Sequence, residues 1–230
     1  EMARAAKFTL LEGYDVNALT TVTGISSDGS TVVGRYSDGS ALRAFQWKAD
    51  TGFSLMGTLG GRHSHAYDAS DNGTTLVGYS TNNDNKAQAF VWTQASGMTG
   101  IEAPEGHESY ANSVSADGST VVGYTKNSDQ FMEAFIWTAD SGLTGLGSLV
   151  NNGTTQALGI SADGSTVTGS GVNAFGLPEA FIWTQGSGMT GLGGLHSTVS
   201  YSMGYDISAD GSAVTGVTYN DNNLMEAFIW

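Results

Sequence analysis

The sequence GSTVVGYTKNSDQFMEAFIW, residues 118–137, contains two landmarks that recur along the whole chain. The first is the turn glycine, which returns at intervals of 44 to 47 residues as Gly29, Gly73, Gly118, Gly164 and Gly211. The second is the closing tryptophan, which returns at intervals of 45 to 47 residues as Trp47, Trp92, Trp137, Trp183 and Trp230. Self-similarity with this period indicates a repeat protein. The repeat leaves no break for a domain boundary, so residues 1–230 are predicted to form a single domain.

Each repeat contains four short segments with strand character, which we name strands a, b, c and d. In the third repeat they are residues 110–115, 120–124, 133–138 and 143–147. An Asp-Gly pair joins strands a and b, and it is a strong hairpin signal because glycine accepts a positive φ. The second repeat has Asn72 in place of the aspartate, which indicates a turn and not a catalytic carboxylate. Four antiparallel strands and one tryptophan per repeat predict an all-β, five-bladed β-propeller.

The two chain ends predict how the ring closes. We place the units at 14–58, 59–103, 104–149, 150–195 and 196–230, and the last unit ends at Trp230 before any strand d. Residues 7–11 (KFTLL) resemble residues 52–56 (GFSLM), one period later. We therefore predict that residues 1–13 complete the fifth blade and that this N-terminal strand pairs with it. Such closure removes the open edges of the array.

The aromatic residues of strand c are predicted to form the core. Phe45 and Trp47 lie two residues apart, so their rings share one face of the strand, and the same pair recurs in every repeat. An aromatic stripe at a fixed interior position is normally structural, so we do not assign these rings to carbohydrate stacking.

Composition excludes several classes of function. The chain has 22 acidic and 8 basic residues and a net charge of −14, which argues against nucleic acid as a partner. Without cysteine, neither disulfide nor thiol chemistry is available. No apolar run is long enough to span a membrane, and residues 1–7 lack the apolar region of a signal peptide. We expect a monomer that does not insert into the membrane and has no cofactor.

Three recurring runs suggest a family. GISADGSTV (159–167), Ala-Phe-x-Trp and GMTGLGGL (188–195) resemble the bacterial extracellular HAF repeats, which occur in secreted proteins and in autotransporter-like passenger regions. The resemblance covers almost the whole chain and implies a secreted or cell-surface location. It implies no settled chemistry. The histidine that names those repeats is replaced here, so no role of it is carried over; the replacing residues are Arg43, Gln88, Glu133, Glu179 and Glu226.

The irregular sequence is expected on one side of the propeller. The d–a and b–c connections should emerge on one face, which we call the loop face, and the a–b and c–d turns on the opposite, turn face. The loop face should carry all four histidines and the start of strand a, where function usually concentrates. The predicted ligand-binding residues are His63, His65, Tyr67, Asp68, His107, Tyr110, Asn112, His196, Tyr205 and Asp206.

Three functional interpretations stay open. The first is a purely structural repeat region of a larger surface protein, with solvated loops and hydrogen-bonded channel groups. The second is a non-enzymatic binding or adhesion module that takes a glycan or a surface-protein ligand at the loop face. The third is a glycoside hydrolase with Asp68 and Asp206 as paired carboxylates and Glu105 or Glu108 assisting, which requires carboxylates about 5–10 Å apart. We favour the second.

Two metal hypotheses carry little support. Calcium at the channel mouth would use the two aspartates, but no calcium-loop motif is present. Zinc on His63 and His65 lacks further ligands.

Overall fold

The computed structural model describes residue 11 and residues 19–104, 106–127, 129–195 and 201–230, and these form five antiparallel sheets. The first sheet contains β1 (Leu19–Ile25), β2 (Thr31–Ser37), β3 (Leu42–Lys48) and β4 (Gly52–Leu55). The second contains β5 (Gly60–Ala69), β6 (Thr75–Asn82), β7 (Ala87–Thr93) and β8 (Gly97–Gly100). The third contains β9 (Glu108–Val114), β10 (Thr120–Lys126), β11 (Met132–Thr138) and β12 (Gly142–Gly145). The fourth contains β13 (Thr155–Ile160), β14 (Thr166–Val172), β15 (Pro178–Thr184) and β16 (Gly188–Gly191). The fifth contains β17 (Ser202–Ile207), β18 (Val214–Tyr219) and β19 (Met225–Ile229).

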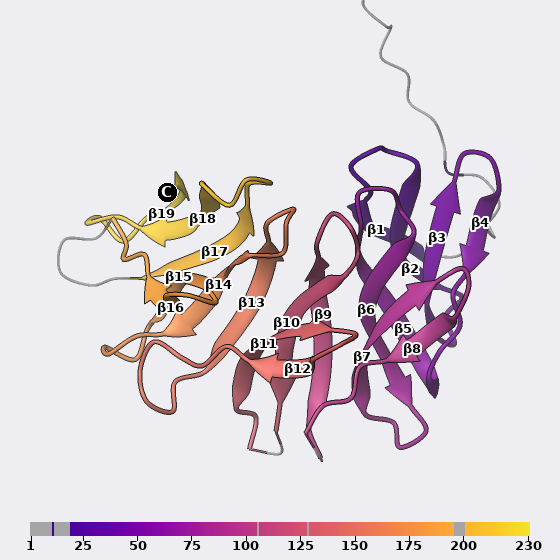
Figure 1. The fold of residues 1–230 in the computed structure, drawn as a ribbon, viewed down its shortest axis with the longest axis horizontal. Coiled ribbons are helices and arrows are strands. Elements are labelled where there is room, and N and C mark those ends of the chain that lie inside the picture. Colours follow the sequence, from indigo (N-terminus) through magenta and orange to yellow (C-terminus); the bar gives the residue numbers. More distant parts are fainter. Residues whose placement is uncertain (1–10, 12–18, 105, 128, 196–200) are drawn as a thin grey trace, which may run out of the picture.

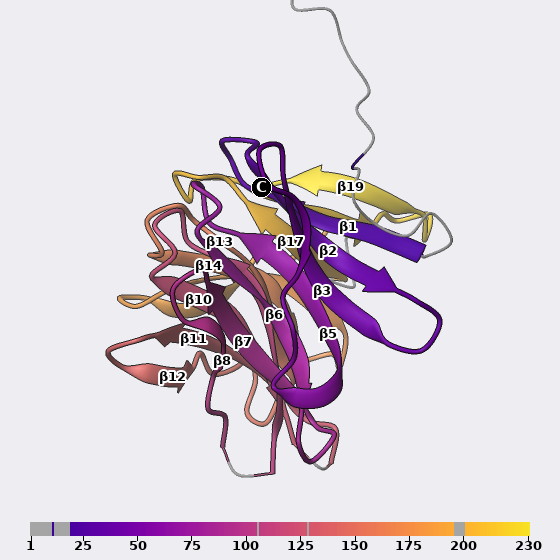
Figure 2. The same ribbon diagram turned by 90° about the vertical axis from the view of Figure 1, so that its right-hand side faces the viewer.

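The sheets follow one another in an arc, from the indigo first sheet to the yellow fifth sheet (Figure 1), and in the turned view the first sheet faces the viewer (Figure 2). Each sheet is a meander in which every strand pairs with the next in sequence. The strands predicted for the third repeat agree with β9–β12 to within about two residues at each end. None of the described residues lies in a helix that could span a membrane.

The recurring Asp-Gly turn has two structural reasons for its glycine. Gly118 has a φ of 76°, and the equivalent glycines of the other four repeats have φ between 62° and 74°. In addition, a Cβ on Gly118 would lie 2.3 Å from Thr75 Oγ1 of the preceding sheet. The turn therefore serves both the hairpin and the contact between sheets.

The turn aspartates are structural, as predicted. Asp163 accepts hydrogen bonds from Ser161 Oγ and from the backbone N–H and hydroxyl of Ser165, at 2.7, 3.0 and 2.8 Å. These bonds, above all the one from Ser161, lower the pKa of Asp163 to about 2. Asp210 repeats the arrangement with Ser208 and Ser212, and its pKa is also lowered to about 2.

The core consists of apolar layers between successive sheets. The layer between the first two contains Val33 and Ala44 on one side and Phe90 and Trp92 on the other, and two further layers repeat it. Strand c supplies a fully buried phenylalanine in four sheets: Phe45, Phe90, Phe135 and Phe181. Each contributes about 2–3 kcal/mol of hydrophobic free energy. The phenylalanine half of the predicted stripe is thus core, whereas Trp137 and Trp183 are only half-buried.

Buried hydroxyls join neighbouring sheets at one repeated point. The backbone N–H of a strand c alanine donates to a serine or threonine hydroxyl on strand a of the next sheet, at 2.9 to 3.0 Å. The four pairs are Ala44–Ser64, Ala89–Ser109, Ala134–Thr155 and Ala180–Ser202. The turn face adds a backbone ladder in which Asp71 N–H donates to Ala116 O, Ala116 N–H to Ala162 O, and Ala162 N–H to Ala209 O.

The two outer sheets expose the faces that the inner sheets bury. Val22 is 52% exposed, although the equivalent Ala66, Ala111 and Ala157 are fully buried, and Ile25 is 59% exposed. No described strand packs closely enough on the outer face of β1 to bury Val22. The predicted ring closure depends on residues 7–10, which lie outside the described residues.

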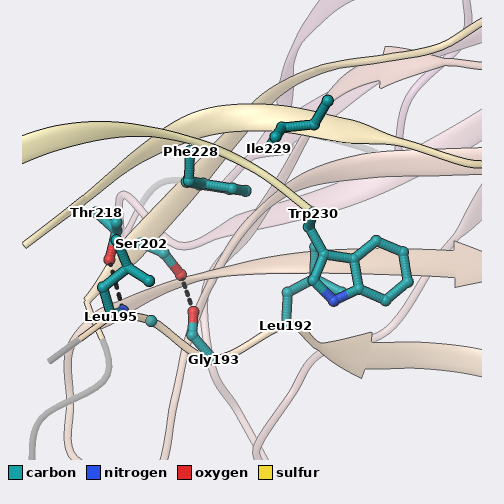
Figure 3. Close-up of a pocket in the computed structure, with 9 residues that line it drawn as sticks. Leu192, Gly193, Leu195, Ser202, Thr218, Phe228, Ile229 and Trp230 are labelled. Atoms are coloured by element: carbon teal, nitrogen blue, oxygen red, sulfur yellow. Dashed lines mark hydrogen bonds between the residues drawn. The ribbon is translucent and has the colours of Figure 1, made fainter. Parts of the chain in front are cut away.

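The fifth sheet ends at β19, with no fourth strand beside it among the described residues. A hollow of about 130 Å³ opens along this strand, and Leu192, Leu195, Phe228 and Trp230 are among its lining residues (Figure 3). Phe228 is only half-buried and Trp230 is 53% exposed. The described residues therefore cover the fifth Phe–Trp pair, predicted as core, only in part, because none of them takes the strand d position that covers the tryptophan in other sheets.

Candidate functional site

Five aromatic side chains meet on the inner strands of the second and third sheets, and we call them the tyrosine cluster. It contains His65 and Tyr67 of β5, Tyr79 of β6, Tyr110 of β9 and Tyr124 of β10. The His65 ring lies 4.4 Å from Tyr67 and 6.1 Å from Tyr79. Tyr79 reaches Tyr110 across the boundary between the sheets at 5.0 Å, and Tyr110 stacks on Tyr124 at 4.9 Å with 16° between the planes.

Strand register explains the cluster. In the antiparallel pairs, His65 lies opposite Tyr79 and Tyr110 lies opposite Tyr124. Directly opposed residues have neighbouring Cβ atoms, so each pair brings two rings together on one face. Gly78 permits the close strand approach, since a Cβ there would lie 2.0 Å from the carbonyl oxygen of His65. The packing of the second sheet against the third then joins the two pairs.

His65 is buried and electrostatically unusual. Its side chain is 7% exposed, and its Nε2 is enclosed without a hydrogen-bond partner among the described residues. Burial, assisted by the positive charge of Arg35, lowers the pKa of His65 to about 4. The imidazole is therefore neutral at physiological pH and has an unused polar nitrogen.

The tyrosines of the cluster are half-buried. Burial is the main cause that raises the pKa of Tyr67, Tyr110 and Tyr124 above the ordinary value of 10. The hydroxyl of Tyr110 donates to Glu108 Oε2 at 3.4 Å. The cluster thus has a cation on the side of the first sheet, Arg35, and a carboxylate on the side of the third, Glu108.

Asp68 has a structural role between the second and third sheets. Its Oδ2 accepts hydrogen bonds from Ser113 Oγ and Val114 N–H at 2.8 and 3.0 Å, and its Oδ1 accepts one from Ala69 N–H at 2.8 Å. Burial raises the pKa of Asp68, and the charge of Asp206 raises it further. The structure therefore brings the two predicted carboxylates within electrostatic range, but three donors already occupy Asp68.

The other predicted residues are spread over several environments. His63 Nδ1 accepts the backbone N–H of Leu42 at 3.1 Å, and Asn112 Nδ2 donates to Ala157 O at 2.8 Å, so both join neighbouring sheets. His107 Nδ1 is enclosed without a partner among the described residues. Tyr205 and Asp206 are exposed on the fifth sheet. His196 and Glu105 lie outside the described residues.

Comparison with solved structures identifies the architecture. A putative TolB from Agrobacterium tumefaciens superposes with a TM-score of 0.65 at 15% identity, covering 94% of this chain and 83% of that one. The β-propeller domain of the Trilobed protease from Pyrococcus furiosus gives a TM-score of 0.65 at 14% identity, covering 92% and 68%. The fold is a β-propeller. The five sheets are its blades, and the fifth has three described strands.

At these identities the comparison defines the propeller fold alone. TolB from Acinetobacter baumannii gives a TM-score of 0.53 at 16% identity, and this chain spans only 40% of its length. No model of a known protein family matches the chain, and no curated protein matches it.

The propeller brings together three of the ten predicted residues, His65, Tyr67 and Tyr110, and adds two that sequence reasoning missed. Tyr79 and Tyr124 follow the glycine of strand b, whereas the predicted site residues come from strand a and the connection before it. The antiparallel register of the predicted hairpins was the signal that could have found them. Within the described part of the chain, no group of three or more metal-ligating side chains comes together.

Proposed function

We propose that this propeller is a secreted or cell-surface binding module that takes a glycan at the tyrosine cluster. The tyrosine cluster is the observation that carries the proposal. Half-buried rings offer flat apolar surfaces for the C–H faces of a sugar, and their neutral hydroxyls donate and accept hydrogen bonds.

Charge and composition support this function over the alternatives. The net charge of −14 disfavours polyanions, so the ligand is a neutral glycan and not a nucleic acid or an acidic polymer. The absence of cysteine and the resemblance to HAF repeats support the extracellular location. The hydrolase interpretation is disfavoured because Asp68, one of its two carboxylates, is held by three hydrogen bonds.

A glycan array with two tyrosine variants tests the proposal. We expect binding to neutral glycans that falls at least about tenfold in Tyr67→Ala and in Tyr110→Ala, a loss of about 1.4 kcal/mol or more. Tyr219→Ala is the matched control, because Tyr219 forms an aromatic pair with Tyr201 on the fifth blade, 4.7 Å apart. Equal binding by all variants would contradict the proposal. Turnover of a polysaccharide that Asp206→Asn abolishes would replace it with the hydrolase.

The finer architecture is also a proposal: the five blades close into a ring, with residues 7–11 as the fourth strand of the fifth blade. The hollow beside β19 supports this, because strand d covers the tryptophan in the other blades. There, Trp47 is opposite Phe53 and Trp137 is opposite Leu143. One period before Phe53 stands Phe8, which has the size and position to cover Trp230.

The first and fifth blades have complementary polar groups for a fifth interface. Thr20 stands where the bridging hydroxyls Ser64 and Ser109 stand in later blades, and its enclosed Oγ1 has no partner among the described residues. Ala227 is the strand c alanine whose N–H would donate to it. On the turn face, the ladder stops at Ala209, and Ser27 O is the matching acceptor. These groups correspond to the ones that the four observed interfaces use.

A cysteine pair tests closure in this cysteine-free chain. Ser27→Cys with Ala209→Cys should form a disulfide within one molecule under mild oxidation. Ala116→Cys with Ala162→Cys, across an observed interface, is the control. Deletion of residues 1–12 should also lower the melting temperature sharply. Closure would be refuted if the control pair formed its disulfide and the test pair did not. It would also be refuted if the test pair formed a disulfide only between two molecules.

A further inference from the structure

Three equivalent hollows open on the turn face, one at each of the first three boundaries between blades. The first contains Trp92, the second Trp137 and the third Trp183, and their volumes are about 270, 410 and 290 Å³. Ligand pockets in proteins have volumes of about 300–1,000 Å³, so all three are close to or within that range. They lie on the face opposite to the loop connections of the tyrosine cluster.

The lining of the hollows repeats with the sequence period. Each tryptophan is flanked by the a–b turn of its own blade and by the threonine that follows it in strand c. In the second hollow these neighbours are Gly118, Ser119 and Thr138, and the preceding blade adds Val91. Trp137 and Trp183 are half-buried, so part of each indole is accessible, which differs from the sequence-based expectation that these rings are only structural. Trp92 is buried, with 9% of its surface exposed.

The charges of the lining follow no pattern. Lys48 lines the first hollow, Asp140 lines the second, and no charged residue lines the third. The hollows therefore share no charged group, which favours a neutral ligand over a charged one. An indole surface beside hydroxyl groups suits a ring that is apolar on its faces and polar at its edge.

We propose that the second and third inter-blade hollows are saccharide-binding sites, each stacking one pyranose unit of a neutral glycan on its half-buried tryptophan. The two sites are related by the repeat, with Trp137 and Trp183 separated by 46 residues, and they share one face. A polymer or a glycan-coated surface therefore engages both at once. Multivalent engagement strengthens binding by about 10²–10⁴ over a single site. This surface is separate from the tyrosine cluster and does not require ligand binding there.

Tryptophan fluorescence tests the proposal directly, because every tryptophan of the chain occupies this strand c position. The probes are neutral oligosaccharides of glucose, mannose and N-acetylglucosamine, each also immobilised as a polymer. We expect a saturable fluorescence change with at least one probe and about 10²-fold tighter binding to its polymer. No saturable change with any probe would overturn the proposal.

Rim substitutions localise the site without disturbing the core. Ser119→Tyr and Ser165→Tyr together fill the second and third hollows from exposed positions, and should weaken polymer binding at least about tenfold. Ser30→Tyr, the same turn position of the first blade, is the control, because it lines none of the three hollows. Ala139→Lys, on the exposed c–d turn, is the alternative if the tyrosine variant does not fold. Unchanged binding in a folded rim variant would refute the assignment.

The tyrosine variants distinguish this surface from the loop face. Tyr110→Ala should leave the fluorescence titration unchanged even where it weakens array binding. If Tyr110→Ala removes the fluorescence change and the rim variants do not, the loop face is the only glycan site and this proposal fails.

Discussion

Acid should destabilise the protein through His65, and the effect should disappear in His65→Phe. The imidazole is 7% exposed and packs on Tyr67 and Tyr79, and its pKa is lowered to about 4. In the unfolded chain the pKa returns to about 6.5. Below that pH the unfolded state binds a proton that the folded state does not bind. Stability is therefore fully present above pH 6.5 and is lost as the pH falls toward 4.

The two pKa values set the size of the effect. The loss of unfolding free energy due to His65 should be about 1 kcal/mol at about pH 5.5 and about 2–3 kcal/mol at about pH 4.5. Asp163 and Asp210, with pKa values of about 2, titrate below this window. Phenylalanine has a similar ring and no titrating nitrogen. Its variant should match or exceed the stability of the natural protein at neutral pH, because no enclosed nitrogen remains unpaired.

Denaturant titrations at several pH values measure the effect. Unfolding free energies of the natural protein and of His65→Phe are compared from about pH 7.5 down to about pH 4.5. Their difference should grow by about 2 kcal/mol or more over this range. Arg35→Gln should reduce the acid sensitivity slightly, because the Arg35 charge contributes to the low pKa of His65. Parallel pH curves for the natural protein and His65→Phe would refute the reasoning.

Three further predictions concern the contacts between blades. In thermal unfolding, Gly118→Ala should lower the unfolding free energy by about 3 kcal/mol and Gly29→Ala by only about 1 kcal/mol. Both glycines have a positive φ, but only Gly118 lies against a threonine side chain. Equal losses would show that the threonine moves aside without cost. In denaturant titrations, Asp68→Ala should lower the unfolding free energy by about 2–4 kcal/mol, because three hydrogen-bond donors lose their acceptor. An unchanged free energy would mean that water replaces the carboxylate. Ser109→Ala should lower the unfolding free energy by about 1–3 kcal/mol, because the backbone N–H of Ala89 loses its hydroxyl acceptor. Ser119→Ala, at an exposed position, should change the unfolding free energy by less than about 0.5 kcal/mol. Similar values for the two variants would contradict the hydroxyl bridge.

The strands and turns were predictable because local rules decide them. An Asp-Gly pair specifies its hairpin through the positive φ of one glycine, and alternation places Phe135 and Trp137 on one face whatever surrounds the blade. The burial of Trp137 was not predictable in the same way. The hollow beside Trp137 lies between two blades, so the exposure of the ring depends on how closely the preceding blade packs. No pattern within one strand sets that distance.

The turn-face hollows and the tyrosine cluster also differ in how far the sequence alone predicts them. The repeat itself implies the turn-face hollows, since a tryptophan and a turn glycine that recur together must produce similar surroundings each time. The tyrosine cluster depends on a single boundary, where Tyr79 of one blade meets Tyr110 of the next. Arg35 and Ser170 hold the Tyr79 position in the first and fourth blades, and neither is aromatic. Within the described blades, the cluster is therefore one local site, whereas the turn face offers the same site more than once. A glycan polymer would distinguish the two faces by valency, binding the turn face in proportion to the number of intact boundaries and the loop face only once.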